Sequence, residues 1–130
     1  MKELSDQIVA GIGAHNLWKN RLRMAIETET ADLSVNVVRD DHQCAFGKWL
    51  HGSNLGEEVV KSNHYRKCAE FHRRFHIVAS EILALAIGGK KREASEKMKP
   101  NEEFNRVSVE LTNAMMGWRV SLDKPSPFNR

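Results

Sequence analysis

The sequence predicts an all-α fold, an antiparallel helical bundle. Long stretches of the chain repeat apolar residues every three or four positions, which is the spacing of one face of an α-helix. The alternation of apolar and polar residues that is typical of strands is rare. With 130 residues, of which 41% are hydrophobic, the chain is long enough to bury the core of one domain. We expect four main helices and a short helical element that carries Cys44–Leu50, in a domain over residues 1–123, followed by a flexible tail at 124–130.

The first helix is expected to begin at Ser5, whose hydroxyl can accept a hydrogen bond from a free backbone N–H, and to end in the polar stretch 27–32. The pattern over residues 33–41 is ambiguous. A short helix or turn should follow at Cys44–Leu50 and stop at Gly52. The buried face of the first helix is marked by residues four, three, seven and four positions apart: Ile8, Ile12, His15, Leu22 and Ile26.

The longest periodic stretch covers about 57–87 and predicts a helix that ends at the Gly88–Gly89 pair, because glycine readily takes the left-handed conformation that closes a helix. The last helical stretch runs from about 91 to 122, with an apolar seam close to 3.5 residues per turn. Pro100 lies inside this stretch and should kink the helix or split it in two. The part of the seam around Trp118 is a candidate surface for a second copy of the chain.

Composition excludes several classes of protein. No apolar run is long enough to cross a membrane, and the first residues lack the pattern of a secretory signal, so we expect a cytoplasmic protein with no membrane partner. Two cysteines cannot form a disulfide scaffold. The 20 basic and 17 acidic residues alternate and leave a net charge of only +3. Because aromatic residues are not interleaved with the basic ones on one face, we expect no nucleic-acid partner.

Two histidines suggest a metal site. His72 and His76 are four residues apart, which places both imidazoles on one face of a helix. They lie on or beside the apolar stripe, where an unpartnered imidazole would carry a desolvation cost that a shared cation removes. His15 occupies the apolar seam of the first helix, seven residues from apolar neighbours on either side. The alternative, that these are neutral core histidines with backbone partners, stays open.

Cys44 could complete a set of ligands, because three imidazoles and one thiolate suit tetrahedral Zn²⁺. Cys68 is a competitor, but it lies eight residues before His76, about 12 Å along a helix axis, which is too far for one zinc ion to bind both. His64 and Cys68 form a rival pair four residues apart, in polar surroundings. Two further histidines flank the Cys44 element among polar neighbours and should be exposed to solvent: His42 and His51.

Three segments carry a resemblance to a known family. They are Ala14–Leu22, Cys44–Leu50 and Phe71–His76, and the string Cys-Ala-Phe-Gly-Lys-Trp-Leu is the most specific of them. On these the chain resembles the chemoreceptor zinc-binding (CZB) domain family over about residues 5–122. The resemblance implies a helical bundle, commonly a homodimer, and a zinc ion held by three histidines and one cysteine. These fall on four residues of this chain: His15, Cys44, His72 and His76.

The resemblance also implies a regulatory protein rather than an enzyme, with no catalytic residues and no cofactor besides the metal. Four protein ligands leave zinc no open position for a substrate, which agrees with this. Zinc loss or oxidation of Cys44 is the expected signal, in chemotaxis or cyclic-di-GMP-type signalling of bacteria. We see no attached receptor, cyclase or membrane segment, so we expect either that the output passes to a separate signalling protein or that the domain buffers zinc by itself. The alternatives are a metal-free helical interaction module and, less favoured, a metallohydrolase.

Overall fold

The computed structural model describes residues 2–53 and 55–123, and the predicted tail 124–130 lies outside this part. The described residues form helices connected by short loops, with no strand among them. This confirms the all-α prediction. In chain order the helices are α1 (Lys2–Asn16), α2 (Trp18–Thr28), α3 (Val35–Arg39), α4 (Ala45–Leu50), α5 (Glu57–Lys61), α6 (Asn63–Ile87), α7 (Lys91–Lys97) and α8 (Glu103–Asp123).

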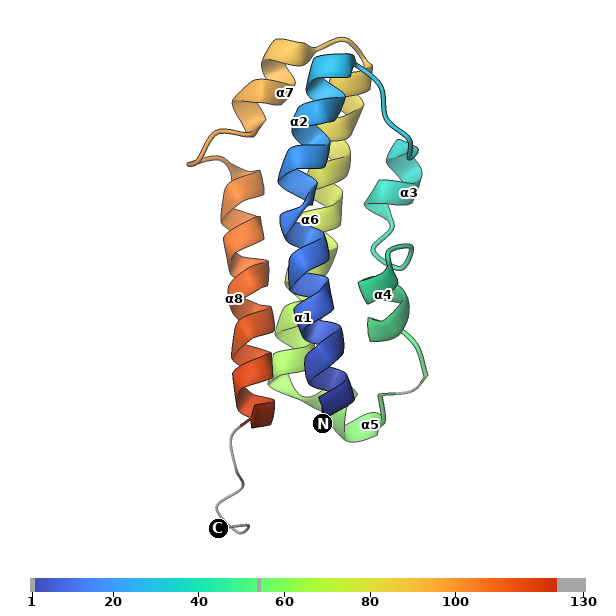
Figure 1. Ribbon diagram of the computed structural model, residues 1–130, viewed down its shortest axis with the longest axis vertical. Coiled ribbons are helices and arrows are strands. Elements are labelled where there is room, and N and C mark those ends of the chain that lie inside the picture. Colours follow the sequence, from blue (N-terminus) through green and yellow to red (C-terminus); the bar gives the residue numbers. More distant parts are fainter. Residues whose placement is uncertain (1, 54, 124–130) are drawn as a thin grey trace.

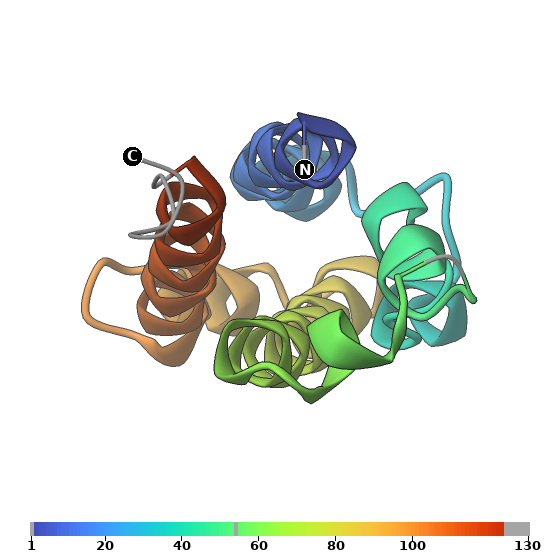
Figure 2. The same ribbon diagram turned by 90° about the horizontal axis from the view of Figure 1, so that it is seen from below.

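The helices form an antiparallel bundle of four columns (Figures 1 and 2). One column is α1 followed by α2, and another is α6. The last helix, α8, makes the third, while α7 crosses one end of the bundle. The fourth column consists of the short helices α3 and α4 and the loop between them, so the predicted Cys44–Leu50 element is a part of a column rather than an addition to it.

Some predicted helix ends differ from the structure because of capping. The first helix already includes Lys2, so Ser5 lies inside it and is not the N-cap. The ambiguous segment 33–41 contains α3, which begins where the Ser34 hydroxyl accepts a hydrogen bond from the backbone N–H of Val37 at 3.2 Å. Ser62 divides the predicted helix 57–87 into α5 and α6, because its backbone is extended and its hydroxyl caps α6.

Pro100 splits the last helical stretch, as one of the two predicted outcomes, and α7 and α8 lie on either side of it. Trp118 is only 2% exposed and lies against the rings of Trp49 and Tyr65 at centroid distances of 5.9 and 6.0 Å. The suggestion that its seam offers a surface is therefore wrong. The outer side of α8 instead exposes three other apolar residues: Val109, Met116 and Val120.

Two glycines allow α4 to lie close to its neighbours. A Cβ at Gly11 of α1 would overlap the ring of Phe46, and a Cβ at Gly47 of α4 would overlap the backbone carbonyl oxygen of Asp41. Phe46 and Leu50, at 4% and 0% exposure, anchor α4 in the core. The N-terminus of α4 is thereby held against α1 and α6. The core itself runs between the four columns, and its most deeply buried apolar residues include Ile8, Leu22, Phe75, Ile82, Leu111 and Met115.

None of the helices described is both long enough and apolar enough to span a membrane.

Candidate metal centre

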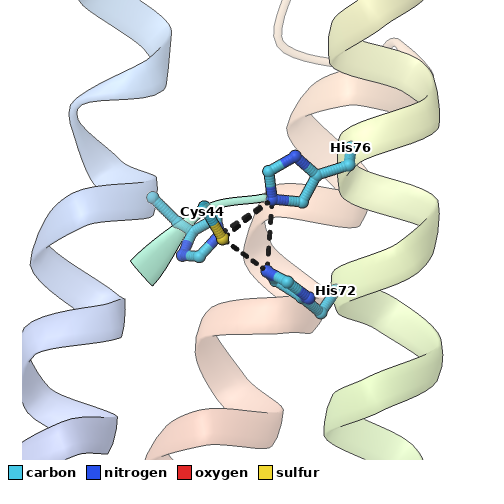
Figure 3. A group of neighbouring side chains, drawn as sticks. Cys44, His72 and His76 are labelled. Atoms are coloured by element: carbon cyan, nitrogen blue, oxygen red, sulfur yellow. Dashed lines mark hydrogen bonds between the residues drawn. The ribbon is translucent and has the colours of Figure 1, made fainter. Parts of the chain in front are cut away.

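Four side chains from three columns converge in the interior. His15 comes from α1, Cys44 is the N-cap residue of α4, and His72 and His76 come from α6. One potential ligand atom of each lies within 4.8 Å of those of the others. The three imidazoles are 4%, 0% and 2% exposed, and Cys44 is half-buried. Figure 3 shows the sulfur of Cys44 directed at the rings of His72 and His76.

The separations of the ligand atoms are those of a tetrahedral zinc site. Nε2 of His76 lies 3.3 Å from Nε2 of His15 and 3.1 Å from Nε2 of His72. Sγ of Cys44 lies 3.4 and 3.5 Å from Nε2 of His72 and His76. Zinc bonds of about 2.0 Å to nitrogen and about 2.3 Å to sulfur would place the corners of a tetrahedron about 3.3 Å (nitrogen to nitrogen) and about 3.5 Å (nitrogen to sulfur) apart. The residues therefore fit one shared ion.

Backbone carbonyls determine which nitrogen carries the proton in two of the rings. Nδ1 of His15 lies 2.7 Å from the carbonyl oxygen of Gly11, and Nδ1 of His76 lies 2.8 Å from that of Val38. A carbonyl oxygen only accepts, so each Nδ1–H donates and each Nε2 of a neutral ring presents a lone pair. The two lone pairs face each other across 3.3 Å, an arrangement that is repulsive unless a proton or a cation lies between them.

Burial keeps these imidazoles in the form that binds metals. Desolvation lowers the pKa of His15 to about 4 and that of His72 to about 2, and it also lowers the pKa of His76. Neutral imidazoles can bind a metal directly, whereas a thiol must first lose its proton. Desolvation raises the pKa of the Cys44 thiol, so the charge of a bound cation is what would hold it as a thiolate at neutral pH.

Cys44 is positioned by the short helix that it caps. Its Sγ accepts a hydrogen bond from the backbone N–H of Gly47 at 3.2 Å, in the way that serine or aspartate caps other helices. This bond aims the sulfur away from solvent and toward α6. A cavity of about 350 Å³ lies between α1, α2 and the α3–α4 column. Its lining includes His15, Cys44 and His76, so small molecules have a path to the candidate ligands.

The third ring differs from the other two in its second nitrogen. Nδ1 of His72 is fully buried and has no hydrogen-bond partner among the residues that the structure describes. Its nearest acidic group is Oδ2 of Asp41, at 3.8 Å. A ligating histidine commonly donates its other N–H to a carboxylate, which orients the ring and makes it a better ligand. Asp41 can take this role after a small movement, and sequence reasoning missed it, although it lies only three residues before Cys44.

The other predicted positions fall outside the buried cluster. Cys68 is fully buried, its pKa is raised to about 12 by desolvation, and it is not among the clustered ligand atoms, in agreement with the spacing argument. His64, its rival partner, is exposed. His42 and His51 are exposed, as predicted. They are not independent of each other, however, because both lie close to the carboxylate of Asp41.

The comparisons with known proteins agree with this geometry. A family model described as the chemoreceptor zinc-binding domain matches residues 15–83, more than half of the chain, and this range contains all four clustered residues. No curated protein and no solved structure matches the chain significantly. The helical bundle, the His₃Cys cluster and the family match together show that the chain belongs to the chemoreceptor zinc-binding domain family.

Proposed function

We propose that the chain is a regulatory domain that binds one Zn²⁺ through His15, Cys44, His72 and His76. The observation that carries the proposal is the contact between Nε2 of His15 and Nε2 of His76, two lone pairs that backbone carbonyls hold 3.3 Å apart. The Cys44 sulfur lies 3.5 Å from the same His76 nitrogen. A zinc ion at this point would turn a repulsive contact into four bonds. The same four ligands would fill the coordination sphere, which favours a sensor over an enzyme because catalytic zinc needs an open position.

Cys44 is the ligand that we propose to be labile. It is the least buried of the four, it stands on a helix of six residues, and the 350 Å³ cavity reaches it. A hydroperoxide can oxidise the thiolate: an S–O bond forms, the O–O bond breaks, and the leaving alkoxide or hydroxide takes a proton from solvent. The resulting sulfenic acid is a weaker ligand, so oxidation or simple zinc loss would release Cys44 from the centre.

We propose that the protein forms a homodimer and acts in a cytoplasmic bacterial signalling system. Its change of state on zinc loss would be transmitted to a signalling partner through an exposed apolar face. Support for self-association comes from two exposed apolar stripes on neighbouring columns. One is Val109, Met116 and Val120 of α8. The other, on the column formed by α1 and α2, consists of Val9, Leu17 and Met24, and the six side chains are 48–60% exposed.

The test is the zinc content of tag-free protein purified without chelator, measured by plasma mass spectrometry for the wild type and for alanine variants of the four residues. We expect one tightly held equivalent in the wild type and its loss in each variant. His64→Ala, which changes an exposed histidine outside the cluster, is the matched control and should retain the metal. Wild-type protein without zinc, or a His15→Ala variant with full zinc affinity, would refute the proposal.

A further inference from the structure

A second group of potential metal ligands lies at the surface beside the buried centre. Asp41, His42 and His51 place one ligand atom each within 4.8 Å of the others. Nε2 of His51 is 3.0 Å from Oδ2 of Asp41, and Nε2 of His42 is 4.0 Å from Oδ1 of the same carboxylate. The two imidazoles are stacked, with centroids 3.7 Å apart and planes at 11°. Two imidazoles and one carboxylate are thus collected at one point of the surface.

The fold holds these residues at both ends of α4. Asp41 and His42 precede Cys44 in the loop that leads into the helix, and His51 is its C-cap residue. The carboxylate of Asp40 shapes this loop by accepting a hydrogen bond from the backbone N–H of His42 at 3.0 Å. The backbone carbonyl of Asp41 lies directly against Gly47, the residue where a Cβ would not fit. The surface group and the N-cap Cys44 are therefore parts of one rigidly connected segment.

A buried group connects this segment to the interior. The Oδ2 atom that contacts His51 is also 3.8 Å from Nδ1 of His72. His72 is 0% exposed, and this nitrogen has no hydrogen-bond partner within the described part of the chain. Asp41 itself has a side chain only 13% exposed, with an exposed imidazole on one side and a buried one on the other. A single ring, that of His72, separates the carboxylate from the cluster of Nε2 atoms.

We propose that Asp41, His42 and His51 form a second, solvent-exposed site for a divalent transition-metal ion, from which zinc passes to the buried centre; the transfer step rests on the proposed function. Imidazole and carboxylate ligands suit Zn²⁺. Three protein ligands leave room for water, so this site holds zinc more weakly and exchanges it faster than the buried one. The ring planes must tilt apart to aim both lone pairs at one ion; the side chain of His42 is 58% exposed and that of His51 25%.

The surface site would add a second route for zinc to the buried centre, beside the cavity lined by His15, Cys44 and His76. The three imidazoles of the buried centre are almost inaccessible to solvent, so a hydrated ion must lose its water before reaching them. The surface ligands replace part of that water with nitrogen and oxygen ligands. Only the ring of His72 then separates the ion from the buried cluster. When Asp41 turns from His51 to His72, it releases the ion from the surface and at the same time accepts the Nδ1–H bond that orients His72 as a ligand.

The experiment uses the metal-stripped full chain and Zn²⁺ alone as the probe. Competition with a chromophoric chelator gives the number and strength of sites, and stopped-flow mixing gives the rate of loading. We expect the wild type to bind one tight and one weaker equivalent. The double variant His42→Ala/His51→Ala should lose the weaker equivalent, keep the tight one, and load it more slowly than the wild type. His64→Ala is the exposed control and should match the wild type.

The possible outcomes separate the two proposals. A wild type with only the tight equivalent, or a double variant that binds two equivalents or loads at the wild-type rate, overturns the surface site. A wild type with only the weaker equivalent overturns the buried zinc centre instead. His76→Ala should retain the weaker equivalent after losing the tight one. If the double variant is misfolded by circular dichroism, Asp41→Asn, which preserves the shape of the side chain, should lose the weaker equivalent, and its retention there counts against the site.

Discussion

His72 and His76 project from the middle of α6, a helix of 25 residues, whereas Cys44 stands at the first turn of α4, which has six. The two α6 imidazoles are surrounded by core side chains, and their positions follow from a helix that contacts every other column. Cys44 depends on an N-cap bond and on two tight glycine contacts. The comparison leads us to expect a rigid side of the candidate centre on α6 and a more mobile side on α4, as the proposed sensor function requires.

Removing zinc should produce the largest effect and should affect the α4 side first. With free zinc about a thousand times above its Kd, binding contributes about 4 kcal/mol to the free energy of unfolding. Chelation at pH 7.5 should therefore lower Tm by roughly 10 °C in thermal unfolding followed by circular dichroism. Hydrogen exchange should show faster exchange in α4 (45–50) than in the middle of α6. Equal loss of protection in both helices would remove the distinction between the two sides.

Gly47→Ala tests the attachment of α4 directly. The added Cβ would overlap the carbonyl oxygen of Asp41, a backbone atom that cannot turn aside, so we expect a loss of about 2 kcal/mol in the free energy of unfolding and a much lower zinc content. The matched control is Gly117→Ala in α8, where a Cβ meets nothing within 4 Å and the higher helix propensity of alanine should stabilise the protein slightly. Urea unfolding measures the free energy of unfolding of both variants, and metal analysis measures their zinc content. Equal values for the two variants would contradict the prediction.

The pH dependence of the metal-free protein measures how firmly the imidazoles are held on the rigid side. The pKa values of His15 and His72 are lowered to about 4 and about 2 in the folded state, whereas an unfolded histidine has a pKa near 6.5. The unfolded chain therefore binds protons first as pH falls. Stability is full above about pH 6.5 and decreases below it by about 1 kcal/mol per group per pH unit.

Urea unfolding between pH 7.5 and 5 checks this decrease. His64→Ala, which removes an exposed imidazole, should leave the profile unchanged. A flat profile for the metal-free wild type would mean that the rings become accessible and protonated without unfolding, and so that α6 is not the rigid side.

The smallest effect on stability is expected at the exposed face of α8. Met116→Lys places a charge in the middle of an apolar stripe, so it should convert a homodimer into a monomer in sedimentation velocity experiments while changing the free energy of unfolding by less than about 0.5 kcal/mol. Ser95→Lys adds the same charge on α7, away from this stripe, and should leave the association intact. Identical sedimentation of all three proteins would exclude this face as the interface.

The sequence was sufficient for the course of the long helices, because their burial repeats with the period of the helix itself, but not for the break at Leu17 that divides the first predicted helix into α1 and α2. His15, His72 and His76 could be selected as ligands for the same reason, since each polar ring interrupts an apolar stripe. The features that escaped prediction depend on single hydrogen bonds or on contacts between distant segments. Ser62 fits the periodic pattern equally well in a continuous helix, and only its capping bond divides α5 from α6. Asp41 gains its role from His51 and His72, which lie 10 and 31 residues further along the chain.

The bond from Nδ1 of His76 to the carbonyl of Val38 has a mechanical consequence. Val38 belongs to α3, so the His76 ring is hydrogen-bonded to the α3 half of the α3–α4 column. The sulfur of Cys44, at the start of the α4 half, lies 3.5 Å from the other nitrogen of the same ring. A metal ion in the centre would connect this column to α1 and α6 through its bonds to side chains of all three. Its departure would remove the link between Cys44 and His76 but leave the bond to Val38, so we expect the loss of one ion to alter the α4 half of the column more than its α3 half.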